Sequence, residues 1–104
     1  MEDKKLKKLE RELAKKYDKH CHGPNNMGYT IWLKEPFKFG EIADPDEIYF
    51  DTDNMEITGF YAWKNHLYLT DGCGDSPIEG LLSDNEAQKF LDYISDEKNL
   101  EFEH

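Results

Sequence analysis

The sequence predicts a domain of the α+β class, with an N-terminal helix, a C-terminal helix and an antiparallel sheet of four to five strands between them. Apolar residues recur every three or four positions near both ends of the chain, whereas in the middle they alternate with polar residues. A chain of 104 residues is long enough for one hydrophobic core, and no linker or repeat divides it. We therefore expect residues 1–104 to form a single domain.

The N-terminal helix is expected over residues 3–21. Gly23 and Pro24 follow it and supply a typical stop, since glycine adopts the left-handed cap and proline cannot continue a helix. Lysine and glutamate flank a narrow apolar stripe at helical spacing, which consists of Leu6, Leu9, Leu13, Tyr17 and His20.

The C-terminal helix is marked by its beginning. Ser83 and Glu86 are spaced as a capping box, in which each side chain accepts a backbone N–H of the first turn. The buried stripe that follows, ending near Ser95, consists of Ala87, Phe90, Leu91 and Ile94. Residues 71–77 are expected to form an irregular loop, and residues 100–104 a frayed tail.

The middle of the chain alternates with a period of two, which is typical of strands. Three strands are expected around residues 29–33, 37–39 and 48–50, with prolines Pro36 and Pro45 between them. Residues 55–64 and 66–71 then give the strongest hairpin signal in the sequence.

The register of this hairpin has two solutions. A two-residue loop at Lys64 and Asn65 pairs Trp63 with His66, whereas a three-residue loop pairs Trp63 with Leu67. We favour the three-residue loop because it gathers one coherent apolar face, made of Ile57, Tyr61, Trp63, Leu67 and Leu69. Aromatic residues then lie on both faces, and two helices have difficulty covering both, so one aromatic patch is expected to stay exposed.

The net charge is strongly negative, and the charged residues are distributed unevenly along the sequence. The chain has 13 lysines and arginines against 23 aspartates and glutamates, a net charge of −10. Residues 1–22 hold eight basic and five acidic side chains, so the remaining residues carry −13. No basic residue lies between Lys38 and Lys64, where seven carboxylates gather. A domain with this excess of negative charge repels nucleic acid and anionic membranes, because binding to phosphates depends on lysine and arginine.

The sequence also indicates a cytoplasmic location. No apolar run approaches the roughly 20 residues that a membrane-spanning helix needs, and the first residues do not resemble an export signal. Cys21 and Cys73 are therefore expected to remain reduced thiols.

No motif in the sequence requires a particular chemistry. His20, Cys21 and His22, with Cys73, have the residue types of a zinc site, but adjacent helical residues point in different directions. No residue can be named to orient a cysteine nucleophile. The segment from Asp51 to Asn54 begins like a calcium loop, but it lacks the glycine and glutamate that complete one. We expect no metal, no cofactor and no enzymatic activity.

Exposed aromatic residues rimmed by carboxylates are typical of a protein-binding surface with a basic partner. The charge and size match small acidic inhibitors of nucleic-acid enzymes, such as phage antagonists of bacterial defence nucleases and immunity proteins of nuclease toxins. The hypothesis is an inhibitor that occupies the groove of a nuclease or another nucleic-acid-binding enzyme. The alternatives are a housekeeping protein whose acidity serves solubility, and a protein with a minor metal or thiol site. The expected interface comprises Glu41, Asp44, Asp46, Glu47, Asp51, Asp53, Glu56, Tyr61 and Trp63.

Overall fold

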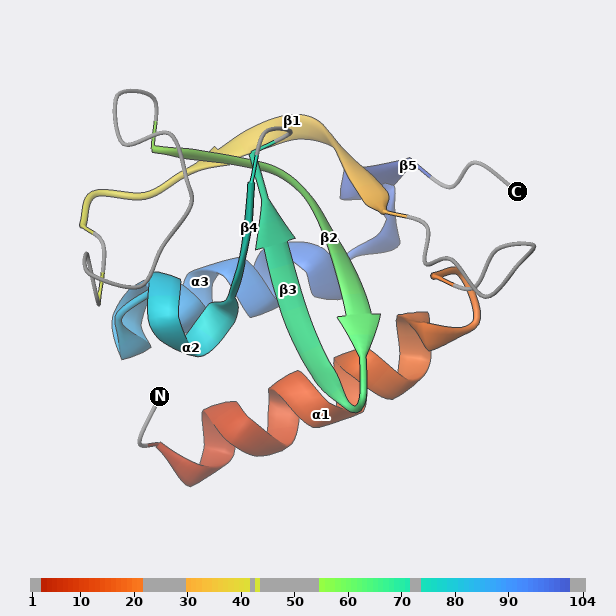
Figure 1. Ribbon diagram of the computed structural model, residues 1–104, viewed down its shortest axis with the longest axis horizontal. Coiled ribbons are helices and arrows are strands. Elements are labelled where there is room, and N and C mark those ends of the chain that lie inside the picture. Colours follow the sequence, from red (N-terminus) through yellow and green to blue (C-terminus); the bar gives the residue numbers. More distant parts are fainter. Residues whose placement is uncertain (1–2, 22–29, 42, 44–54, 72–73, 102–104) are drawn as a thin grey trace.

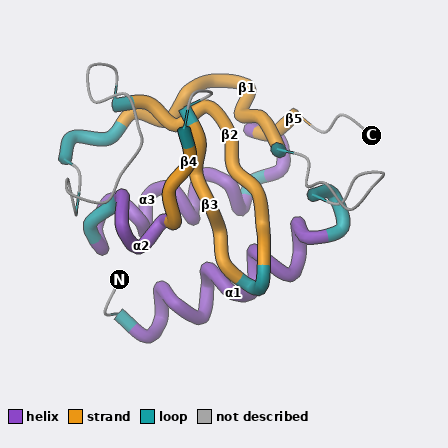
Figure 2. Tube along the Cα trace, viewed as in Figure 1, coloured by secondary structure: helices purple, strands orange, loops and turns teal. Residues whose placement is uncertain are grey.

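A computed structural model describes residues 3–21, 30–41, 43, 55–71 and 74–101, and it confirms the α+β class. Its elements form a five-stranded antiparallel sheet in the order β4-β3-β2-β1-β5, with the long helices α1 and α3 packed on one face (Figures 1 and 2). None of the helices within these ranges is long and apolar enough to cross a membrane. The elements in chain order are α1 (Lys4–Asp18), β1 (Ile31–Lys38), β2 (Glu56–Trp63), β3 (His66–Thr70), β4 (Asp75–Pro77), α2 (Ile78–Leu81), α3 (Asp84–Ser95), the 3₁₀ helix η2 (Glu97–Asn99) and β5 (Leu100–Glu101).

Helix α1 begins close to its expected start, because Asp3 caps it by accepting the N–H of Lys5 at 2.8 Å. Its buried face differs from the expected stripe at one important place. Glu10 is buried, with 2% of its surface exposed, whereas Leu9 is only partly buried. A carboxylate therefore lies inside the apolar series of this helix.

Helix α3 begins after Ser83 as expected, but the capping box is wrong. The Ser83 side chain makes no capping hydrogen bond. Glu86 instead turns away from its own helix, and its Oε1 accepts the N–H of Gly40 at 2.8 Å. Glu86 thus binds the backbone N–H of Gly40, just after β1, instead of completing a capping box with Ser83.

The strands are arranged differently from the expectation in several places. The two strands expected around residues 29–33 and 37–39 are one strand, β1, which spans Ile31–Lys38 and whose register shifts between Trp32 and Phe37. Residue 29 lies outside the described residues. Pro36 lies in this irregular part, where its missing N–H removes a ladder hydrogen bond. The strand expected at residues 48–50 lies outside the described residues. Residues 75–77 form β4 instead of a loop, and Leu100 pairs with β1 and is buried instead of frayed.

The favoured hairpin register is wrong, and the two-residue alternative is correct. Trp63 pairs with His66 and Tyr61 with Tyr68. Lys64 and Asn65 form the turn with φ angles of 51° and 66°, the left-handed values that suit a tight hairpin between right-twisted strands. Tyr61 and Trp63 therefore do not share a face with Leu67 and Leu69.

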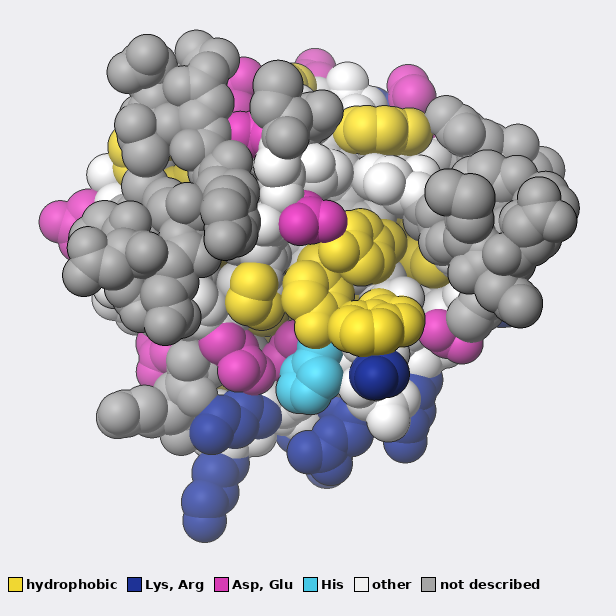
Figure 3. Space-filling view, in the orientation of Figure 1, with side chains coloured by type: hydrophobic (Ala, Val, Ile, Leu, Met, Phe, Trp, Pro, Cys, Tyr) yellow, Lys and Arg dark blue, Asp and Glu magenta, His cyan; other side chains and the backbone are white. Residues whose placement is uncertain are grey.

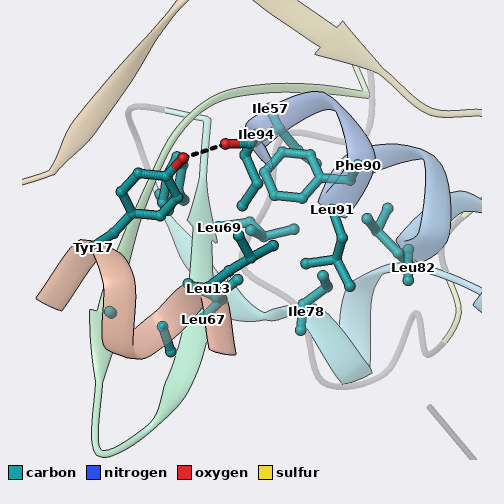
Figure 4. Packing of buried hydrophobic residues seen from close by; sticks show 14 of the residues in the cluster. Leu13, Tyr17, Ile57, Leu67, Leu69, Ile78, Leu82, Phe90, Leu91 and Ile94 are labelled. Atoms are coloured by element: carbon teal, nitrogen blue, oxygen red, sulfur yellow. Dashed lines mark hydrogen bonds between the residues drawn. The ribbon is translucent and has the colours of Figure 1, made fainter. Parts of the chain in front are cut away.

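The core lies between the helices and one face of the sheet. Phe60 of β2 makes edge-to-face contacts with Tyr17 of α1, at 5.5 Å between ring centroids, and with Phe90 of α3, at 6.2 Å. Both helices thus cover the face that Phe60 occupies. The Tyr17 hydroxyl donates to the Ile94 carbonyl at the end of α3 (Figure 4). Burial raises the pKa of Tyr17 to about 12, so this donor keeps its proton.

Candidate protein-binding surface

The sheet face opposite the core carries an aromatic surface. Alternation along β2 and β3 places the partners of two neighbouring cross-strand pairs there, Tyr61 with Tyr68 and Trp63 with His66. In Figure 3 the hydrophobic side chains gather near the centre of this face, with lysine and arginine side chains concentrated below them. We call the set Trp32, Tyr61, Trp63 and Tyr68 the aromatic face.

Three side chains of the aromatic face contact one another. The rings of Tyr61 and Tyr68 stack with centroids 5.2 Å apart and planes 9° apart, and Trp63 lies 6.0 Å from Tyr68. The Tyr61 hydroxyl donates to Asp75 Oδ2 at 2.7 Å. Burial, and then this hydrogen bond to a carboxylate, raises the pKa of Tyr61 well above its ordinary value. Trp63 nevertheless keeps 52% of its surface exposed.

Gly59 lets Trp32 join the aromatic face. Gly59 pairs with Trp32 across the β1–β2 ladder. A Cβ at position 59 would lie 2.8 Å from Cε3 of the Trp32 ring and 3.0 Å from the carbonyl oxygen of Ile31. The indole therefore packs directly against the glycine backbone, in a space that no side chain can share.

Basic groups lie at the hairpin end of the aromatic face. Lys64 Nζ lies 4.3 Å above the Trp63 ring, a cation–π contact. Beside them is an open hollow of about 400 Å³, lined by Lys15, Asp18, Trp63, Lys64 and Asn65. The neighbourhood of Trp63 is thus aromatic and cationic at this end.

The structure brings only part of the expected interface together. Tyr61 and Trp63 lie on the same face, as partners of Tyr68 and His66. Glu56 pairs with Lys38 at 3.8 Å and begins β2, about 23 Å along the strand from Trp63. Glu41 is exposed. The other expected carboxylates lie outside the described residues, and they are Asp44, Asp46, Glu47, Asp51 and Asp53.

Sequence reasoning did not include Trp32 in this surface, and its favoured register placed Tyr68 on the face opposite Tyr61 and Trp63. The signal that finds them is the two-residue turn, because it places Tyr68 opposite Tyr61. Trp32 follows from its pairing with a glycine, which leaves room for a large ring across the ladder.

A cluster of polar side chains lies next to the turn of the β2–β3 hairpin. Glu10 Oε2 accepts the N–H of Leu67 at 2.9 Å and lies 3.6 Å from His66 Nδ1. Burial raises the pKa of Glu10, and the neighbouring Glu79 carboxyl group raises it further, against the lowering by the Leu67 N–H. Sequence reasoning missed this group, although Glu10 occupies a buried position of the helical repeat between Leu6 and Leu13.

The cysteine and histidine cluster considered from the sequence is only partly described. Cys21 is a buried free thiol, and its sulfur accepts the N–H of Ala62 at 3.3 Å. Burial raises the pKa of Cys21, which disfavours the thiolate that a metal or a nucleophilic reaction needs. His22 and Cys73 lie outside the described residues.

Comparisons of the chain with protein-family models, with curated proteins and with solved structures found no match. The functional inference therefore depends on the residues and their geometry.

Gly59→Ala should lower the free energy of unfolding by about 1–3 kcal/mol, because the new methyl group meets the Thr30 methyl group, the Trp32 ring and the Ile31 carbonyl oxygen. Gly80→Ala is the matched control, since its Cβ would meet only Pro77 Cγ, at 3.8 Å. Urea unfolding of both variants measures the difference. Equal stability of the two variants would show that Trp32 does not pack against Gly59.

Proposed function

We propose that this protein binds a basic protein through its aromatic face, and that the partner is a nuclease or another nucleic-acid-binding enzyme whose groove it occupies. The observation that carries the proposal is the exposure of Trp63, 52% of whose surface is open to solvent on a sheet face that α1 and α3 do not cover. A large apolar ring in this position has a surface to bury against a partner.

The chemistry of the aromatic face suits protein recognition. Tryptophan and tyrosine give a large contact area at low conformational cost and dominate the binding energy of many interfaces. The stack of Tyr61 on Tyr68 and the bond from Tyr61 to Asp75 fix the rings before binding. Little side-chain entropy is then lost when the partner docks, which favours affinity.

The net charge of −10 supports a basic partner. A polyanion attracts a positively charged groove over a distance and repels the nucleic acid that the groove normally holds. The charges also suggest an orientation. Lys15 and Lys64 lie at the hairpin end, so the basic part of the groove is expected to face away from that end.

An acidic protein in such a groove excludes nucleic acid and inhibits the enzyme without any chemistry of its own. Phage antagonists of defence nucleases and immunity proteins of nuclease toxins act as inhibitors of this kind, and we place the protein in that functional class. The cytoplasm is the proposed location, since nucleic-acid-handling enzymes work there.

The proposal is tested by capture and competition. The immobilised protein should retain a basic enzyme from a nuclease-treated lysate near physiological salt, and added DNA or RNA should elute it from the same site. Neutralising acidic residues of the segment Glu41 to Glu56 should slow association with the enzyme. The difference in association rate from the parent chain should become smaller as the salt concentration rises. The substituted residues are Asp44, Asp46, Glu47, Asp51 and Asp53.

A control variant separates this effect from net charge alone. It neutralises five exposed carboxylates elsewhere, which are Glu12, Asp84, Asp92, Glu97 and Glu101. An equal decrease in association rate in both variants would contradict occupation of a basic groove. Capture of an enzyme that added nucleic acid does not elute would contradict it as well.

Trp63→Ala should speed dissociation from the captured enzyme by a factor that corresponds to about 2 kcal/mol or more, because it removes the exposed ring. Trp63→Phe should restore part of the residence time. Surface plasmon resonance measures both rates, and thermal unfolding checks that the variants stay folded. An unchanged dissociation rate in Trp63→Ala would remove the aromatic face from the interface.

A further inference from the structure

Three side chains from three separate elements meet beneath the turn of the β2–β3 hairpin. They are Glu10 of α1, His66 at the start of β3 and Glu79 of α2. Each offers one possible ligand atom, and the three atoms all lie within 4.8 Å of one another. The fold thus gathers an imidazole nitrogen and two carboxylate oxygens at one point.

The distances are close to those of a metal centre. Ligand atoms bound at about 2.1 Å to one tetrahedral ion lie about 3.4 Å from one another. Glu10 Oε2 and His66 Nδ1 are 3.6 Å apart. The three ligand atoms lie within 4.8 Å of one another, so a bound ion requires them to move closer, and His66 and Glu79 are the two exposed side chains of the set.

The charge of this cluster needs compensation. Glu10 is 2% exposed, and a second carboxyl group, that of Glu79, lies against it. In the part of the chain that the structure describes, no lysine or arginine forms an ion pair with Glu10, and its ion-pair partner is His66. A buried carboxylate next to another carboxylate is costly unless a proton or a cation joins them.

We propose that Glu10, His66 and Glu79 bind one divalent transition-metal ion, and that Zn²⁺ is the ion whose preferences the set meets best. Zn²⁺ takes histidine and glutamate ligands, and three protein ligands leave its fourth position for water. Ca²⁺ and Mg²⁺ prefer ligand sets made wholly of oxygen, so the imidazole favours a transition metal. The ion fastens the hairpin turn to α1 and α2, and its binding therefore stabilises the folded chain.

The chain offers matched variants for the test. His66 has 55% of its side chain exposed and Glu79 is exposed, so His66→Asn and Glu79→Gln leave the core intact. Glu10→Gln keeps an oxygen that can accept the Leu67 N–H while removing the charge. His20→Asn and Glu12→Gln are controls, which alter a histidine and a glutamate outside the cluster.

Isothermal titration calorimetry and thermal unfolding of the full chain, with ZnCl₂ or MgCl₂ and a phosphine reductant, decide the question. One Zn²⁺ should bind per chain and raise the melting temperature, and Mg²⁺ should do neither at the same concentration. Each cluster variant should weaken Zn²⁺ binding by about tenfold or more. Both control variants should bind as the parent chain does.

Four results would overturn the site. The first is an absence of Zn²⁺ binding in the titration. The second is Zn²⁺ binding by the cluster variants as tight as that of the parent chain, and the third is loss of binding in His20→Asn; both would assign the ion to other histidines or to the thiols. The fourth is binding of Mg²⁺ as tight as that of Zn²⁺, which would contradict a role for the imidazole.

Discussion

The two-residue turn at Lys64 and Asn65 determines which aromatic side chains enter the core and which face outward. Side chains of a strand alternate between the two faces, so a slip of one residue would exchange the two sets completely. With this turn, Leu67 and Leu69 are buried with Phe60, and Tyr61, Trp63 and Tyr68 lie on the opposite face. The left-handed backbone at both turn positions fixes this outcome.

The same turn places the polar group beneath it. Because His66 is the first residue of β3, its imidazole comes within 3.6 Å of Glu10 while the next N–H, that of Leu67, donates to the same carboxylate oxygen. A buried glutamate on α1 thus holds the hairpin through a hydrogen bond to the backbone of β3. The aromatic face and the proposed metal site therefore both depend on the register of one hairpin.

The sequence was sufficient for the class of the fold and for the existence of both long helices, because apolar residues recur at helical spacing in α1 and α3, but it did not place Glu10 on the buried face of α1. It was insufficient for the hairpin register, since residues 57–69 are apolar on both faces and pattern alone does not choose between them. The hydrogen bond of Glu86 could not be predicted from the sequence either, because its partner Gly40 lies 46 residues away in the chain. For the site, Tyr61 and Trp63 were found from the sequence, whereas Tyr68 and Glu10 required the register and the packing of α1.

The central claim is that the aromatic face is the surface that a basic enzyme covers. The chain has two tryptophans, Trp32 and Trp63, and both lie on this face, so their indole N–H signals in a ¹⁵N-labelled sample report on it directly. On addition of the captured enzyme near physiological salt, the Trp63 signal should shift or broaden, and added nucleic acid should restore it. An enzyme that binds while both indole signals stay unchanged would contradict the account.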